Sequence, residues 1–71
     1  MSRYKVSGES LRNFYKKPTL LWIVFRDIEH ELKLCGQVVC RFILNGKILS
    51  DVDEVLASQE DLAFVDTLEY E

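Results

Sequence analysis

The sequence lacks any hydrophobic run long enough to cross a membrane. Its longest uncharged apolar stretch covers residues 20–25, whereas a membrane-spanning helix needs about 20 apolar residues. No apolar stretch precedes Leu20, so the pattern of a secretory signal is also missing. We therefore expect a protein of the cytoplasm that has no membrane partner.

Residues that form disulfide frameworks or metal sites are also scarce. The chain has two cysteines and one histidine, too few for a disulfide framework or for a metal knuckle with two ligand pairs. We expect Cys35 and Cys40 to be buried thiols, although their spacing also allows a bridge. His30 falls with Asp27 and Glu31 on the polar positions of a predicted helix, where such residues usually face solvent. We expect no metal ion and no cofactor.

Proline and glycine are rare, with one and three residues respectively. The chain is 48% hydrophobic and 30% charged, which is typical of a folded domain and not of a disordered segment. A chain of this length has room for one core, so we expect a single domain over residues 1–71. The glycines form no phosphate-binding loop, and no serine has the surroundings of a catalytic nucleophile. We therefore expect no enzymatic activity.

Basic residues are missing from the last third of the chain. Residues 48–71 carry eight acids and no base, whereas residues 1–17 carry five bases and one acid. The five bases are Arg3, Lys5, Arg12, Lys16 and Lys17. A nucleic-acid-binding surface is usually strongly basic, but the net charge here is −3. We expect the two ends of the chain to pair with each other, and a nucleic-acid-binding protein is the alternative.

The periodicity of apolar residues predicts two strands and a helix in the first half of the chain. Alternation over residues 3–7 predicts a strand, and residues 11–16 form either a second, weak strand or a loop. A helix is predicted over residues 18–35. Pro18 suits its first turn, and Gly36 suits a left-handed cap at its end.

The second half of the chain predicts a hairpin, a short helix and a closing strand. Asn45-Gly46 favours a two-residue turn with positive φ at both positions, which would join strands at residues 37–44 and 47–49. Ser50 is typical of a helix cap and begins a predicted helix over residues 51–58. A last strand is expected within residues 62–71. Together these elements predict an α+β fold.

The expected core follows from helical and strand spacing. Leu21 and Phe25 begin a stripe that continues along one face of the predicted helix. Alternation in residues 37–44 places Val38, Cys40, Phe42 and Leu44 on one side of a strand and Val39, Arg41 and Ile43 on the other. We expect burial of Phe25, Ile28, Leu32, Phe42 and Leu68.

The hairpin and the residues after it resemble the second half of ubiquitin-like β-grasp domains. The resemblance begins at Arg41-Phe42-Ile43-Leu44-Asn45-Gly46-Lys47-Ile48-Leu49 and continues with a short acidic helix and a closing strand. It implies a single small mixed sheet packed on one main helix, in which the first and last strands lie side by side and parallel. Arg3 and Lys5 would then lie near Glu69 and Glu71. A simpler β-α-β-β-α-β sheet is the alternative.

The same resemblance implies a binding residue. In ubiquitin-like domains an outward isoleucine at the position of Ile43 contacts partner domains, so Ile43 and the flanking Arg41 become candidate contact residues. Ubiquitin-like modifiers act through a C-terminal Gly-Gly, whereas this chain ends in Tyr70-Glu71. Conjugation and sulfur transfer are therefore not expected.

A second candidate surface lies at the start of the predicted helix. If Leu21 and Phe25 face the sheet, Trp22 and Ile23 fall on other sides of the helix and are at least partly exposed. Exposed aromatic residues in a small domain are often buried between partners. We expect a non-catalytic protein–protein interaction or regulatory module, in which Trp22, Ile23 and Leu20 contact another protein or form a homodimer.

Overall fold

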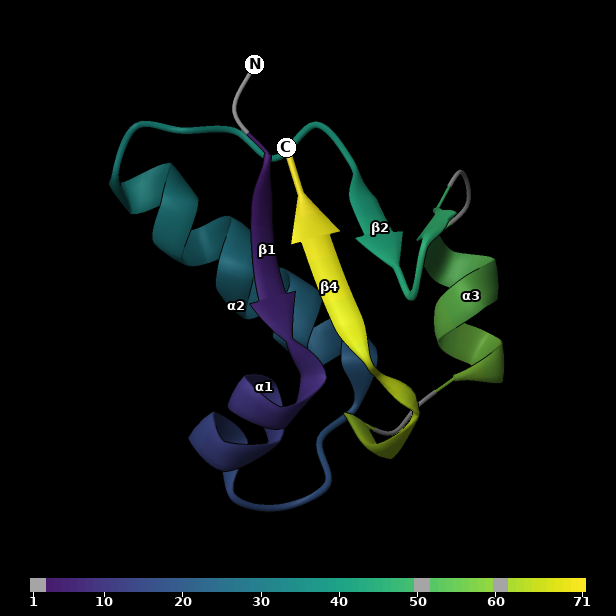
Figure 1. Ribbon diagram of the computed structural model, residues 1–71. Helices are drawn as coiled ribbons and strands as arrows, with labels where there is room; N and C mark the ends of the chain where they lie inside the picture. Colours follow the sequence, from purple (N-terminus) through teal and green to yellow (C-terminus); the bar gives the residue numbers. More distant parts are fainter. Residues whose placement is uncertain (1–2, 50–51, 60–61) are drawn as a thin grey trace.

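A four-stranded sheet packs against one long helix in the computed structural model, which describes residues 3–49, 52–59 and 62–71. Helix α2 crosses behind the sheet (Figure 1). The strands lie in the order β1-β4-β2-β3, and each neighbouring pair is antiparallel. The elements in chain order are β1 (Tyr4–Ser7), α1 (Gly8–Tyr15), α2 (Leu21–Leu34), β2 (Phe42–Leu44), β3 (Lys47–Ile48), α3 (Val52–Ser58), η1 (a 3₁₀ turn, Leu62–Phe64) and β4 (Thr67–Tyr70). The predicted α+β fold is confirmed.

The first and last strands lie side by side, but the predicted parallel pairing is wrong. Tyr4 lies opposite Tyr70 and Val6 opposite Leu68 in an antiparallel ladder, so the sheet is not mixed. The Gly8 amide donates a hydrogen bond to the Asp66 carbonyl at 2.7 Å, and β4 therefore begins where β1 ends. The ubiquitin-like resemblance stays a prediction, and without a parallel ladder it supports no binding site.

Residues 8–15 form helix α1, so both the weak strand and the loop predicted there are wrong. The Ser7 hydroxyl caps this helix by accepting a hydrogen bond from the Ser10 amide at 3.1 Å. Leu11 is buried in the core. Lys16 ends the helix in the left-handed region, with φ of 63°. A serine cap, an acid in the first turn and apolar residues four apart are ordinary helix signals.

Helix α2 begins at Leu21 and not at Pro18, so the prediction for its start was three residues early. Phe25 stacks on Phe42 with ring centroids 4.4 Å apart. Phe25, Phe42 and Leu68 are buried as predicted, whereas Ile28 and Leu32 are half-buried. The core cluster consists of Leu11, Leu21, Val24, Phe25, Phe42, Leu44, Leu49, Leu62, Val65 and Leu68.

The Asn45-Gly46 turn is confirmed. Asn45 has φ of 51° and Gly46 has φ of 83°. The Asn45 side chain also joins this turn to the segment before β4. Its Oδ1 accepts hydrogen bonds from the Asp66 and Thr67 amides at 2.6 and 2.9 Å, and its Nδ2 donates to the Phe64 carbonyl at 2.7 Å. The turn thus carries a long-range contact in addition to its local geometry.

The segment between α2 and β2 differs from the prediction. The strand expected over residues 37–44 covers only Phe42–Leu44, because the preceding residues pass beyond the end of the sheet (Figure 1). Cys35 and Cys40 are therefore free and exposed, not buried. Val38 is 80% exposed, whereas Val39 packs against the core, so Val38 does not share the burial of Phe42, with which alternation places it on one side. Gly36 has φ of 80°, as its capping role requires.

The remaining elements agree in part with the sequence. Helix α3 covers Val52–Ser58, while the predicted cap at Ser50 and start at Asp51 lie outside the described residues. The closing strand is shorter than expected, because residues 62–64 form a 3₁₀ turn. No helix within the described residues is long and apolar enough to span a membrane.

Candidate protein-binding surfaces

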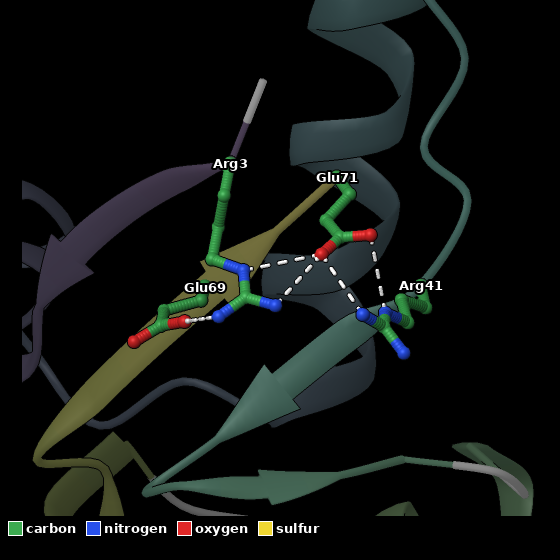
Figure 2. A network of polar contacts seen from close by, with 4 residues as sticks. All are labelled: Arg3, Arg41, Glu69 and Glu71. Atoms are coloured by element: carbon green, nitrogen blue, oxygen red, sulfur yellow. Dashed lines mark hydrogen bonds and ion pairs between the residues drawn. The ribbon is translucent and has the colours of Figure 1, made fainter. Parts of the chain in front are cut away.

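A cluster of ion pairs joins the two ends of the chain to the beginning of β2 (Figure 2). Nη2 and Nε of Arg3 donate to Oε1 of Glu71 at 2.9 and 3.1 Å. Arg41 binds the same carboxylate, with Nη2 at 3.0 Å from Oε1 and Nε at 3.2 Å from Oε2. Arg3 also pairs with Glu69 at 3.4 Å. The predicted pairing of the basic and acidic ends is confirmed for Arg3.

The electrostatics of this cluster are set by Glu71. Hydrogen bonds from Arg41 and then from Arg3 hold the pKa of Glu71 below its ordinary value, because both stabilise the carboxylate. The same contact raises the pKa of Arg41. The backbone of Glu71 also accepts a hydrogen bond from the Cys40 amide and donates one to the Arg41 carbonyl. Glu71 is therefore the point at which the segment after α2 rejoins the sheet.

The candidate contact residues Ile43 and Arg41 do not form an exposed patch. Ile43 is only 6% exposed, which contradicts the expectation that it faces a partner. It lies in the central strand β2, opposite Glu69 on one side and Ile48 on the other, so neighbouring strands flank it on both sides. Arg41 is half-buried and bound to Glu71.

The other candidate surface is exposed as predicted. Trp22 is 42% exposed, Leu20 is also exposed, and Ile23 is half-buried. The guanidinium of Arg26 lies 4.9 Å from the centre of the Trp22 ring, a distance typical of a cation–π contact. We call Leu20, Trp22, Ile23 and Arg26 the Trp22 surface.

A groove between α1 and α2 was not predicted, because residues 11–16 were not expected to form a helix. Its volume is about 560 Å³. Its apolar and aromatic lining consists of Leu11, Phe14, Tyr15, Ile28, Leu32 and Tyr70, and its polar lining of Asp27, His30 and Glu31. Phe14 is 77% exposed. We call this site the α1–α2 groove.

The side chain of Tyr15 links α1 to α2 within the lining of the α1–α2 groove. Its hydroxyl donates a hydrogen bond to Oδ2 of Asp27 at 3.1 Å. Burial and then this hydrogen bond raise the pKa of Tyr15 to about 12. The tyrosine therefore stays a neutral donor at physiological pH, and the two helices are joined by a hydrogen bond as well as by apolar contact.

A metal site does not emerge from the parts of the chain that the structure describes. They contain no group of three or more His, Cys, Asp or Glu side chains that could hold a metal ion. His30 is exposed on α2. No protein-family model, no curated protein and no solved structure matches this chain.

Proposed function

We propose that this protein is a non-catalytic protein-binding module, in which the Trp22 surface contacts another protein or a second copy. The observation that carries the proposal is the exposure of Trp22 beside Leu20, with Arg26 held over the indole ring. Tryptophan and arginine are enriched among the residues that dominate binding energy. Because the cation–π contact already orients both side chains, less conformational entropy is lost on binding.

The nucleic-acid alternative has less support. Arg3 is bound to Glu69 and Glu71, and Nη1 of Arg12 donates to the Val65 carbonyl at 2.6 Å. Two of the five basic residues near the N-terminus are therefore engaged by acceptors of the protein itself. Phosphate binding requires cations that are free to replace counterions.

Site-specific photo-cross-linking tests the proposal. We would place benzoylphenylalanine at position 22 in the source cell, with Lys47 as the control position because its side chain is exposed on β3. A discrete protein adduct from position 22 and none from position 47 would support the proposal. An adduct that nuclease removes, or equal adducts from both positions, would overturn it.

Binding measurements with the captured protein sharpen the test. Trp22→Ala should raise the Kd by about 30-fold or more, because truncating a dominant aromatic contact costs about 2 kcal/mol of binding free energy or more. Lys47→Ala should change the Kd by less than about twofold. Circular dichroism of both variants checks that the fold is retained.

A further inference from the structure

Phe14 and the α1–α2 groove lie next to each other on one surface. Phe14 is largely exposed, although it lines a groove whose other members are mostly apolar. A protruding aromatic beside an apolar hollow is self-complementary, because a two-fold axis places the knob of each copy in the hollow of the other. This geometry favours a second copy as the occupant.

Charge supports the same occupant. Lys16 and Lys17 lie in the loop that leads into the N-terminus of α2, whereas Glu31 lies in its last turns. Lys16 directly follows Tyr15, which lines the α1–α2 groove together with Glu31. A two-fold axis that exchanges these two parts of the groove would bring the lysines of one copy towards Glu31 of the other, where opposite charges would orient the docking.

We infer that the α1–α2 groove receives Phe14 of a second copy, so that two chains form a symmetric dimer oriented by attraction between the lysine pair and Glu31. This inference goes beyond the proposed function and does not depend on it. Trp22 and Arg26 do not line the groove: Trp22 contacts Arg26, which lines a second hollow with Glu29 and Lys33, and His30 borders both hollows. The dimer therefore presents two free Trp22 surfaces, which increases avidity for a multivalent partner.

The first test is sedimentation equilibrium over a range of concentrations. The wild-type chain should form a dimer, and Phe14→Ala should raise the dimer Kd by about 30-fold or more. Asn13→Ala is the matched control, because Asn13 is exposed on α1 and does not line the groove; its Kd should change by less than about twofold. Unfolding curves should show that both variants fold.

The second test reverses the charges. A Lys16→Glu/Lys17→Glu variant and a Glu31→Lys variant should each dimerise more weakly than the wild type, because each places like charges together. Their equimolar mixture should form a heterodimer, since both contacts are then complementary. This recovery separates loss of the contact from loss of the fold.

Three results would overturn the dimer. They are a wild-type chain that stays monomeric at millimolar concentration, a dimer that Phe14→Ala leaves intact, and a mixture that fails to recover. If Trp22→Ala abolishes the dimer and Phe14→Ala does not, the Trp22 surface is the site of self-association. This result would contradict the role of the α1–α2 groove as the dimer contact, but it would agree with the proposed function. Failure of cross-linking at position 22 would refute the proposed function without affecting the dimer.

Discussion

Both ends of helix α2 carry apolar residues, but these residues differ in burial. At the first end, Leu21, Val24 and Phe25 are almost completely buried against the sheet. At the other end, Leu34 is 72% exposed and Val38, just beyond the helix, is exposed as well. Apolar character therefore does not decide burial here, because position over the sheet decides it.

The difference follows from the lengths of the elements. Helix α2 has 14 residues, or about 21 Å at 1.5 Å per residue. The four strands that this helix crosses span about 14 Å at about 4.8 Å between neighbours. A helix that is longer than the sheet it covers must extend past it, and Figure 1 shows the C-terminal end of α2 beyond β1.

The largest expected effect concerns Phe25. Phe25→Ala should lower the free energy of unfolding by about 3–5 kcal/mol, because it removes a buried ring that stacks on Phe42. Leu34→Ala, at the exposed end of the same helix, should change it by less than about 0.5 kcal/mol. Urea denaturation of both variants measures the two values. Equal losses would show that the exposed end is packed in solution.

Two glycines extend this comparison to the backbone. A Cβ atom at Gly8 would lie 1.8 Å from the Val65 carbonyl oxygen, so Gly8→Ala should cost about 3 kcal/mol through overpacking. A Cβ atom at Gly36 would meet nothing within 4 Å, but φ is +80° there. Gly36→Ala should therefore cost only about 1 kcal/mol of backbone strain. A larger loss at Gly36 than at Gly8 would contradict the packing described around Val65.

Acid should weaken the ion pairs of Glu71, which hold the segment between α2 and β2 to the sheet. The folded-state pKa of Glu71 is lowered, so its stabilising contribution is complete above the unfolded pKa of about 4.3 and is lost as the pH falls through the folded value. Glu71→Gln should therefore reduce the slope of stability against pH below about pH 4.3. Glu29→Gln, at an exposed position on α2, is the control. An unchanged slope in Glu71→Gln would show that the ion pairs do not stabilise the fold.

The smallest expected effect concerns the thiols of Cys35 and Cys40, in the segment between α2 and β2. Because Cys35 and Cys40 are free and exposed, both should react with a thiol reagent in the folded protein without a lag for unfolding. Cys35→Ser and Cys40→Ser should each change the free energy of unfolding by less than about 0.5 kcal/mol. Reaction that begins only in denaturant would restore the sequence-based expectation of buried thiols.

Local signals predicted several elements correctly. Asn45-Gly46 predicted a turn with positive φ at both positions, and Gly36 predicted the end of α2, because few residues adopt these conformations without strain. The spacing of Leu21 and Phe25 predicted which side of α2 faces the sheet. It also predicted that Trp22 is exposed. Helix α1 was not predicted, because Gly8-Glu9-Ser10 also fits a turn between two strands, although Ser7 caps the helix in the structure.

The α1–α2 groove could not be predicted without helix α1. Tyr15 and Asp27 are twelve residues apart, and only the packing of the two helices brings them together. The expectation for Ile43 was wrong in the opposite direction. The ubiquitin-like resemblance implied that Ile43 faces outward to a partner, but the residue is only 6% exposed in strand β2, which has a neighbouring strand on each side.

The sequence by itself determined the fold class, the turn at Asn45-Gly46, the inward side of α2 and the attraction between the basic and acidic ends. These features depend on backbone conformations, periodicity and charge, which are properties of residues close together in the chain or of the chain as a whole. Tertiary structure alone decided the direction of β1 against β4, the exposure of Cys35 and Cys40, and the groove beside Phe14. Each of these depends on where distant segments meet, because an apolar alternation fits a parallel or an antiparallel neighbour equally well and an apolar residue is buried only where another element covers it.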